Sequence, residues 1–299
     1  MKIIIAGGTG FIGQHLVNHF TKNGNEVIVL GRSCSSNDKN AGVWDGKTLG
    51  VWVEKLRGTE VLINLTGKSV DCRYTERNKQ EILDSRVNSI LVLGKAFKQI
   101  KEQPKVWINS STATIYREEY ENENNEFSER IGEGFSVDVA KKWEQTLDEV
   151  NLPNTRKIKL RITIVLGKNG GAFPVFKNMV KIGFGGKQGN GKQKFSWIHI
   201  FDLLKIIDLC VENKTVLGVV NCSALETVTN KKFMKVMRKQ MKFPFGIPIP
   251  EILLKIGAEI IGTEPELILK SRWVQSKKLR DLEFKFKFET IEKAIENII

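Results

Sequence analysis

The sequence predicts an α/β fold, a doubly wound parallel sheet with a smaller C-terminal lobe. Three observations at the start of the chain support this prediction. Residues 3–6 form a short apolar run rich in β-branched side chains, which is typical of a strand buried on both faces. Glycines follow at positions 7, 10 and 13. The apolar spacing then becomes that of one helix face, with Phe11, Ile12, Leu16, Val17 and Phe20.

A strand, a glycine turn and a helix in this order begin a Rossmann-type dinucleotide-binding domain. Glycine allows a tight turn, and the helix N-terminus offers free N–H groups and a partial positive charge to a diphosphate. The spacing here is G-x-x-G-x-x-G. We expect Gly7, Thr9, Gly10 and Gly13 to contact the cofactor. The alternative is a structural turn that binds nothing.

Composition narrows the class of protein. The 299 residues include only four cysteines, at 34, 72, 210 and 222, without a C-x-x-C pair, which argues against a metal site or a disulfide framework and favours the cytoplasm. The chain has no apolar run of membrane-spanning length, and the first apolar run is too short for a signal peptide. The net charge of +13 makes an anionic partner, such as a nucleic acid, possible. We attribute this charge to lysines on solvated helix faces and do not expect a nucleic-acid partner, although the charge alone does not exclude one.

The end of the second predicted strand, residues 26–30, indicates the cofactor type. An NAD-specific fold places Asp or Glu here to bind the ribose 2′-OH. Gly31 and Arg32 stand there instead, and the next carboxylate is Asp38. The guanidinium of Arg32 suits a 2′-phosphate, so we expect NADP. The alternative is that Arg32 is an exposed loop cation.

Further strands are predicted at 61–65, 106–109, 158–162 and 219–222, and helices at 75–100, 136–150, 203–213 and 230–242. Residues 34–60 read as irregular. The acidic stretch 117–134 is expected to be a mobile surface loop, and the Gly/Lys-rich stretch 183–194 a lid or substrate loop too polar for the core. The alternating Phe284, Phe286 and Phe288 could form a short strand.

Ligands of open α/β sheets lie at the carboxyl ends of the strands. Leu65, Thr66 and Gly67 are therefore expected to line the cofactor site. Ser110, Ser111 and Thr112 place hydroxyl groups at the end of the next strand, where they are catalytic candidates. Ordinary capping is the alternative for these hydroxyls.

Five separated motifs resemble one superfamily, the extended or atypical short-chain dehydrogenase/reductases of the nucleotide-sugar epimerase-like group. The motifs are residues 7–13 (GGTGFIG), 64–67 (NLTG), 110–116 (SSTATIY), 160–167 (LRITIVLG) and 197–202 (WIHIFD). The segments 81–88 (EILDSRVN), 141–144 (KKWE), 167–172 (GKNGGA) and 217–221 (LGVVN), with the tail from about 247, resemble its "epimerase family protein" subgroup. That subgroup carries an additional C-terminal domain of unknown function.

The resemblance implies a bound NADP(H), a Rossmann domain and a substrate lobe. The NADP-binding domain would comprise residues 1–166 and about 196–222. The substrate lobe would comprise 167–195 and 223–299, with 247–299 as an appended subdomain. The cofactor contacts carried over by position are Gly7, Gly10, Phe11, Ile12, Gly31, Arg32, Leu65, Thr66, Glu81, Arg86 and Val165.

The sequence departs from the superfamily at its acid/base pair. Most members carry Tyr-x-x-x-Lys on the helix after the serine strand, one turn apart on the same face. With Lys141 as the lysine, the tyrosine position holds Val137, and counting from Lys142 gives Asp138. A valine side chain cannot donate or accept a proton, so the superfamily's usual tyrosine is missing.

The remaining catalytic candidates are Thr112, Tyr116 and Lys141. Tyr116 could substitute for the missing tyrosine if its loop brings it over the nicotinamide, and the alternative is a packed aromatic. His199 is expected to anchor a loop, with a catalytic role as its alternative.

Two functions are compatible with these observations. The first is an NADP-dependent oxidoreductase or epimerase acting on an unknown small carbonyl or sugar-like substrate, with residues 183–194 meeting any substrate charge. The second is a non-catalytic NADP(H)-binding sensor or scaffold whose basic surface, including Lys235, Lys239 and Lys242, engages a partner. We favour the enzyme and keep a homodimer open.

Overall fold

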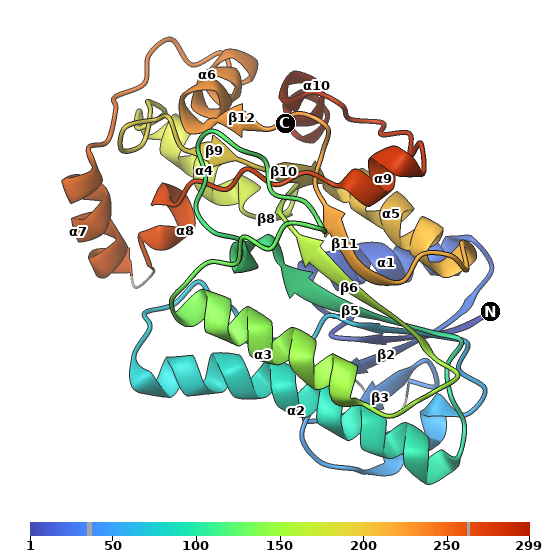
Figure 1. The fold of residues 1–299 in the computed structure, drawn as a ribbon. Coiled ribbons are helices and arrows are strands. Elements are labelled where there is room, and N and C mark those ends of the chain that lie inside the picture. Colours follow the sequence, from blue (N-terminus) through green and yellow to red (C-terminus); the bar gives the residue numbers. More distant parts are fainter. Residues whose placement is uncertain (35–37, 262–263) are drawn as a thin grey trace.

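The computed structural model describes residues 1–34, 38–261 and 264–299, and its centre is a seven-stranded parallel sheet (Figure 1). The strand order is β11-β6-β5-β4-β1-β2-β3, and every neighbouring pair is parallel. The strands are β1 (Lys2–Ala6), β2 (Glu26–Gly31), β3 (Ala41–Val43), β4 (Val61–Asn64), β5 (Val106–Thr112), β6 (Arg156–Ile162) and β11 (Gly218–Cys222). The order reverses between β1 and β4, which creates the crevice where such sheets bind ligands.

Helices cover both faces of this sheet because β1 is buried on both sides. Ile3 and Ile5 pack with residues of α1 (Phe11–Lys22) and α5 (Ile200–Glu212). Ile4 and Ala6 point to the other face, toward the 3₁₀ segment η1 (Val51–Leu56), α2 (Glu76–Ile100) and α3 (Phe135–Glu149). A short 3₁₀ turn, η2 (Ala113–Ile115), follows β5. The doubly wound α/β fold is therefore confirmed.

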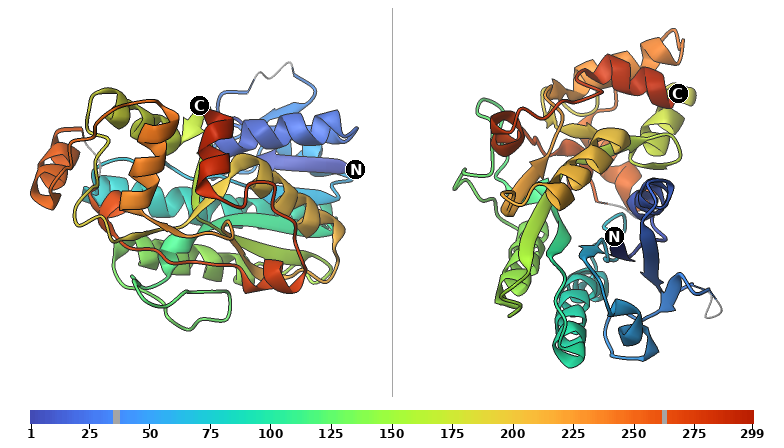
Figure 2. Two further views of the ribbon diagram at one scale, coloured as in Figure 1. Left: turned by 90° about the horizontal axis from the view of Figure 1, so that it is seen from above. Right: turned by 90° about the vertical axis from the view of Figure 1, so that its right-hand side faces the viewer.

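Small β elements and helices extend the chain beyond the carboxyl ends of the main strands (Figure 2). They are β7 (Ile164–Gly167), β8 (Gly170–Gly171), β9 (Lys194–Phe195), β10 (Trp197–His199), β12 (Val228–Thr229), α4 (Phe173–Lys181) and α6 (Asn230–Gln240). Phe176, Phe195 and Phe233 form an aromatic cluster here, with ring centroids 4.2–5.7 Å apart. The predicted domain boundaries stay a prediction.

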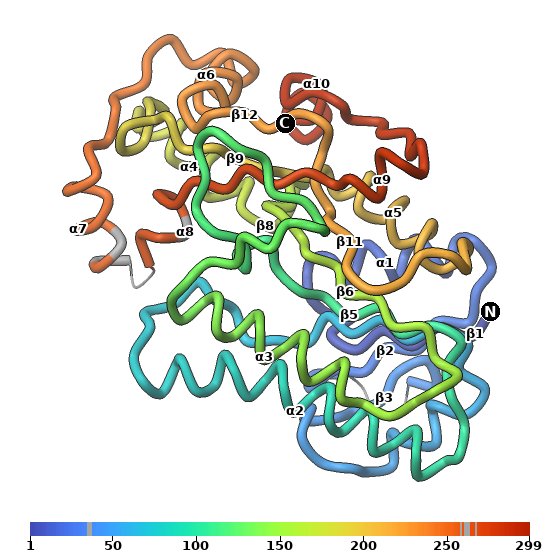
Figure 3. The backbone as a smooth tube through the Cα atoms, viewed as in Figure 1, coloured from blue at the N-terminus to red at the C-terminus, as the bar shows by residue number. Residues whose placement is uncertain are grey.

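The C-terminal segment adds α7 (Glu251–Ile261), α8 (Glu266–Leu269), α9 (Lys277–Asp281) and α10 (Ile291–Ile298). Between α8 and α9 the chain runs beside two earlier segments, as the backbone trace shows (Figure 3). Arg272 pairs with Phe195 and Val274 with Asn124 through isolated β-bridges. The tail is therefore bonded into the body of the protein.

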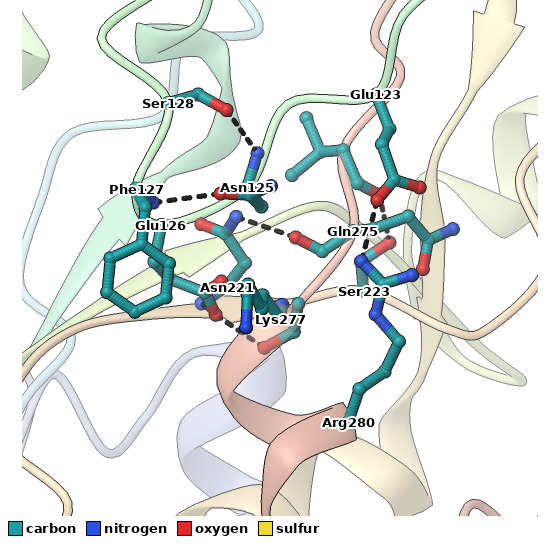
Figure 4. A network of polar contacts seen from close by, with 12 residues as sticks. Glu123, Asn125, Glu126, Phe127, Ser128, Asn221, Ser223, Gln275, Lys277 and Arg280 are labelled. Carbon is teal, nitrogen blue, oxygen red and sulfur yellow. Dashed lines mark hydrogen bonds and ion pairs between the residues drawn. The ribbon is translucent and has the colours of Figure 1, made fainter.

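The predicted surface loop 117–134 is mostly exposed, and Glu126 anchors it to β11 and to the tail (Figure 4). Glu126 accepts hydrogen bonds from the backbone N–H of Asn221, 3.0 Å, and of Lys277, 2.9 Å, and from the Ser276 hydroxyl. Asn124 is fully buried. The polar composition of this loop reflects partners on β11 and on the tail.

Three local expectations are wrong. Residues 183–194 are not too polar for the core, since Gln188 and Gln193 are buried and Gln193 donates to the Gln188 carbonyl at 2.9 Å. Segment 34–60, of which residues 35–37 lie outside the described part, contains β3 and η1. Residues 284–288 form no strand; Phe286 and Phe288 are buried from an irregular segment. No helix in the described ranges has both the length and the apolarity to cross a membrane.

Candidate functional site

The glycine turn after β1 has the geometry that a phosphate cradle needs. Gly7 has φ = +80°, a conformation that glycine adopts readily. A side chain on Gly13 would lie 2.6 Å from the Gly7 carbonyl oxygen, so this glycine permits close packing of the helix. A Cβ on Gly10 would meet only that same oxygen, at 3.5 Å, so Gly10 faces open space. No side chain caps α1, which leaves its first turn available to a ligand.

A cavity of about 400 Å³ opens at the carboxyl ends of the central strands. Seven residues predicted as cofactor or catalytic residues line it: Ile12, Leu65, Thr66, Gly67, Arg86, Thr112 and Val165. Ser110 and Ser111 line it as well. Thr9 instead lines a separate groove of about 570 Å³ beside α1.

Arg86 is the main charged group of this cavity. Its Nη1 donates to the carbonyl oxygens of Lys68 at 3.1 Å and Ile82 at 2.9 Å, and its guanidinium lies 4.9 Å from the Trp143 ring centroid. Burial lowers the pKa of Arg86 to about 10. Among the described residues no carboxylate lies within ion-pair distance of it. Because a partly buried cation without a counter-ion is unfavourable, this arrangement favours an anionic ligand.

Two neutral polar groups beside Arg86 also lack partners. The indole Nε1–H of Trp143 and the hydroxyl of Thr66 are buried, and neither has a hydrogen-bond partner in the described part of the chain. Buried polar groups are normally satisfied by hydrogen bonds. Both residues line the cavity, so an acceptor-rich ligand would satisfy them.

Glu81, a predicted cofactor contact, lies beside the cavity and does not line it. It pairs with Lys68 and, at 2.9 Å, with Arg77. The hydrogen bonds from Lys68 and then Arg77 lower its pKa to about 2, so Glu81 is ionised at neutral pH. Lys68 does line the cavity, and Glu81 therefore acts on the site by orienting that lysine.

The end of β2 leaves Arg32 exposed. No ion pair holds its guanidinium within the described ranges, so it is free to meet a ligand. Gly31 lies tightly between side chains, since a Cβ there would be 2.9 Å from Cys34 Sγ and 3.2 Å from Thr9 Cγ2. Phe11 packs in a similarly restricted place, because a Cβ on Gly170 would be 2.3 Å from its ring.

The structure does not bring the three catalytic candidates together. The Thr112 hydroxyl lies at the cavity and donates to the Thr114 hydroxyl at 2.9 Å. Tyr116 is buried away from it, donates to Asn221 Oδ1 at 2.9 Å, and packs with Val137 and Val274. Burial raises the pKa of Tyr116. Its hydroxyl is thus part of the core, as the alternative of a packed aromatic describes.

Lys141 is exposed on α3 and lines no cavity in the described structure. The residues of α3 that line the cavity are Phe135, Ser136, Val139 and Trp143. The two positions on this face with the spacing of a Tyr-x-x-x-Lys pair are therefore Val139 and Trp143. Lys141 lies two residues, or about 200°, away from Val139 around the helix, so counting from it places the wrong residues at the cavity.

Sequence reasoning missed a row of hydrogen-bonded side chains at the cavity mouth. The Tyr74 hydroxyl lies 3.4 Å from Ser136 Oγ, and Ser136 donates to Glu266 Oε1 at 2.6 Å. Tyr74 packs edge-to-face on Phe135 with centroids 4.9 Å apart. No sequence pattern joins positions 74, 136 and 266, although Tyr74 is one of only three tyrosines.

Glu266 lines a second cavity of about 170 Å³. This cavity shares Thr112, Thr114, Ile162 and Thr163 with the first, so the two are continuous along β5 and the end of β6. Its other charged lining residues are Lys194, Lys270 and Arg272. Burial lowers the pKa of Arg272.

His199 anchors the tail. Its Nδ1 caps α5 by accepting from the Phe201 N–H at 3.1 Å, and its ring stacks on Phe288 at 3.8 Å. Burial lowers its pKa to about 4, so the ring is neutral at neutral pH. It lines neither cavity. No cluster of three or more His, Cys, Asp or Glu side chains suited to a metal ion occurs in the residues that the structure describes.

A buried ion pair supports the cavity floor. Glu144 on α3 accepts two hydrogen bonds from Arg161 on β6, both 2.8 Å, and one from Ser111 on β5, 2.6 Å. Ser111 lines the cavity. The pair therefore fixes α3 against the two strands that form one wall of the site.

Comparisons with known proteins agree with this architecture. The profile of the NAD dependent epimerase/dehydratase family matches residues 3–143, and that of a domain of unknown function, DUF1731, matches residues 249–298. The chain is 33% identical to the epimerase family protein YfhF of Bacillus subtilis, covering 100% of this chain and 98% of the relative. It is 30% identical to the epimerase family protein SA0724 of Staphylococcus aureus, over 100% and 99%.

Solved structures of related proteins share this fold. The human epimerase family protein SDR39U1, determined with NADPH, has a TM-score of 0.89 and 26% identity, covering 100% of this chain and 99% of that one. The UDP-N-acetylglucosamine 4-epimerase of Bacillus cereus, at 19% identity and a TM-score of 0.78 over 100% and 98%, shares the fold. Since the 33% identity to YfhF extends over the full length of both sequences, the chain belongs to the epimerase family proteins of the NAD dependent epimerase/dehydratase family that carry the additional C-terminal domain.

Proposed function

We propose that this protein binds NADP(H) between the glycine turn and the 400 Å³ cavity and acts as an oxidoreductase or epimerase on a small carbonyl or sugar-like substrate. The observation that carries the proposal is the partly buried guanidinium of Arg86, which has no carboxylate partner in the described ranges and lies beside the unpartnered Thr66 and Trp143. An anionic, acceptor-rich dinucleotide supplies what these three groups lack.

The family membership and the NADPH in the human relative's structure support the same cofactor class. When bound, the cofactor supplies a hydride to, or accepts one from, a substrate carbon. In this chain Gly7 and Gly10 would hold the diphosphate, Arg32 the 2′-phosphate and Thr112 the nicotinamide end. We place the protein in the cytoplasm because its cysteines are unpaired.

Calorimetric titration with NADPH and NADH tests the cofactor proposal. A charge-assisted hydrogen bond contributes about 1.5–3 kcal/mol, so Arg32→Ala should weaken NADPH binding by roughly ten- to a hundredfold and leave NADH binding unchanged. Lys39→Ala is the matched control, since Lys39 is another exposed cation after β2. Absence of measurable affinity for both dinucleotides would refute the proposed function.

The second cavity is the proposed substrate pocket because it adjoins the first through Thr112 and Thr114. Lys194 and Arg272 line it, and neither has an ion-pair partner in the described part of the chain, so we propose a substrate with an acidic group. A panel of carbonyl compounds, with and without a carboxylate or phosphate, would be screened for oxidation of bound NADPH in a single turnover. Preference for neutral compounds would refute the acidic substrate.

One observation favours a second candidate, a non-catalytic NADP(H)-binding sensor or scaffold. The cavity face of α3 presents Val139 and Trp143, and neither can transfer a proton. Lys235 and Lys239 are exposed on α6 and would belong to its basic partner surface. NADPH that is bound but never oxidised, together with a salt-dependent nucleic-acid affinity that changes with NADPH, would favour this candidate.

A further inference from the structure

We propose that the acid/base pair absent from α3 is rebuilt from neighbouring elements, with Tyr74 as the proton donor and Arg86 as the cation that stabilises its phenolate. This inference rests on the proposed function, because it needs a nicotinamide in the 400 Å³ cavity. Both residues line that cavity. Tyr74 lies two residues before the first residue of α2, and Arg86 lies within that helix.

The position of Arg86 is the first support. Val139 and Trp143 have the four-residue spacing of a tyrosine and lysine on the cavity face of α3. The Arg86 guanidinium lies over the ring of Trp143, 4.9 Å from its centroid. The Arg86 guanidinium thus lies next to Trp143, the position on α3 that would carry the lysine, although Arg86 itself projects from α2. Gly67 leaves room for it, since a Cβ there would be 3.1 Å from Arg86 Cζ.

The position of Tyr74 is the second support. Phe135, one turn before Val139, packs against the Tyr74 ring, which brings a phenol to the face from which the helix itself supplies none. The charged or titratable groups that act on Tyr74 are Arg86, Glu264, Glu266 and Cys72. Burial, with the two glutamates, raises its pKa, so Tyr74 is protonated at neutral pH and is ready to donate.

The polar contacts of Tyr74 provide a route for proton transfer through Ser136 to Glu266. Ser136 donates its proton to Glu266 Oε1 at 2.6 Å, so its oxygen is free to accept from the Tyr74 hydroxyl 3.4 Å away. Glu266 belongs to the wall of the second cavity and is also bound by Lys270 at 2.6 Å. Tyr74, Ser136 and Glu266 therefore form a continuous chain from one cavity to the next.

The reaction balances with these groups. In carbonyl reduction, hydride from NADPH forms the new C–H bond, the carbonyl π electrons move to oxygen, and the Tyr74 O–H bond breaks as its proton goes to that oxygen. The products are an alcohol, NADP⁺ and the Tyr74 phenolate beside Arg86. Glu266 then takes a proton from a hydronium ion of the solvent, Ser136 passes its own proton to the Tyr74 phenolate, and Glu266 reprotonates Ser136, so the solvent supplies the one proton that the reduction consumes. The reverse sequence oxidises an alcohol.

Tyr116 does not fit this role. Its hydroxyl donates to Asn221, its ring packs among Val137, Ala140 and Val274, and it lines neither cavity. Tyr120 is exposed and donates to Glu118 at 3.2 Å. Of the three tyrosines, Tyr74 is the one that lines any of the three cavities described above.

The first experiment reads the phenol directly and needs no substrate. Protein labelled with ¹³C at the tyrosine Cζ gives three signals, assigned with Tyr74→Phe and Tyr120→Phe. The signal of Tyr74 is titrated without cofactor, with NADPH and with NADP⁺. Because only the oxidised nicotinamide ring is positive, we expect NADP⁺ to lower the Tyr74 pKa by about one unit relative to NADPH, while Tyr120 does not change. Equal Tyr74 pKa values in the two complexes would overturn the proposal.

Arg86 is tested in the cofactor-free protein, so that weakened dinucleotide binding does not interfere. Arg86→Met should raise the Tyr74 pKa, and Arg86→Lys should restore it because the charge is kept. An unchanged Tyr74 pKa in well-folded Arg86→Met protein would overturn the role of Arg86. This arm gives an answer even if calorimetry finds no dinucleotide binding, which would instead refute the proposed function.

Single-turnover oxidation of bound NADPH by an active compound gives the second readout. Tyr74→Phe should slow the hydride step at least a hundredfold with NADPH affinity unchanged, and Tyr120→Phe should match wild type. Ser136→Ala should slow the step less, because the phenol remains. A Tyr74→Phe rate equal to wild type would overturn the proposal.

Discussion

The ion pair between Glu144 and Arg161 allows the sharpest test of how this site is supported. Both side chains are 9% exposed, and the pair is bidentate at 2.8 Å. Glu144→Gln leaves the Arg161 guanidinium buried without its counter-ion and weakens the bond from Ser111. Breaking a buried pair in this way costs about 3–5 kcal/mol. At about 2 °C per kcal/mol for a chain of this size, the thermal midpoint should fall by roughly 6–10 °C.

The same helix and strand supply a matched control. Asp148 on α3 pairs with Lys159 on β6 at 2.8 Å, but its side chain is 57% exposed. Asp148→Asn should change the free energy of unfolding by about 0–1 kcal/mol. Urea and thermal unfolding of both variants make the comparison, and Glu144→Gln combined with Arg161→Met should recover part of the loss. Equal effects of Glu144→Gln and Asp148→Asn would refute the reasoning.

Three further predictions follow from contacts elsewhere. Glu126→Gln should lower the free energy of unfolding by about 2 kcal/mol and expose the tail to proteolysis, because Glu126 accepts hydrogen bonds from Lys277 N, Asn221 N and Ser276 (Figure 4). Glu123 forms an exposed ion pair with Arg280, so the control variant Glu123→Gln should have neither effect. The His199 pKa of about 4 lies below the unfolded value of 6.5, so its contribution is complete above pH 6.5 and falls by about 3 kcal/mol toward pH 4. Urea unfolding across this range should show a smaller loss in His199→Gln than in wild type, and an equal loss would contradict the assignment. Gly13→Ala should destabilise the fold, since its Cβ would lie 2.6 Å from backbone atoms, and normal folding of this variant would contradict the packing argument. Gly10→Ala should fold normally but bind NADPH more weakly in calorimetry.

The regular elements were predictable because their signals are local. The strand at 61–64 is a continuous apolar run, and the helix from 76 has a Thr75 cap that accepts from Asn78 N, so periodicity and capping locate both. β3 has only three residues, Ala-Gly-Val, and its pairing with β2 leaves no pattern in the sequence. Such short edge strands depend on tertiary contacts.

Individual buried residues in polar loops were not predictable for a different reason. The stretch 117–134 is mostly exposed, as composition predicts, yet Asn124 within it is fully buried, as is Gln188 in the stretch 183–194. Gln188 exchanges hydrogen bonds with Asn230, and Asn124 bonds with the backbone of the tail. Burial of a polar side chain depends on a partner far away in sequence, and composition carries no information about that partner.

The cavity wall was predictable where strand ends define it and not where the tail completes it. Leu65, Thr66 and Thr112 were located because parallel strands end at one edge, whereas Val165 was located by the family resemblance. The phase of α3 contained a usable signal, since Val139 and Trp143 share the buried apolar face and Lys141 lies on the opposite, exposed side of the helix. Glu266 had none, because its neighbour Ser136 lies 130 residues away.

The C-terminal segment therefore lines the second cavity. It supplies Glu266, Lys270 and Arg272 to the second cavity, and the buried Ser271 fixes their place. The Ser271 hydroxyl donates to the Glu119 carbonyl at 2.5 Å and accepts from Lys194 N at 2.9 Å. The anchored loop thus positions the tail, and the tail lines the cavity next to Thr112. The proposed proton relay therefore depends on the tail, because Ser136 on α3 donates its hydrogen bond to Glu266.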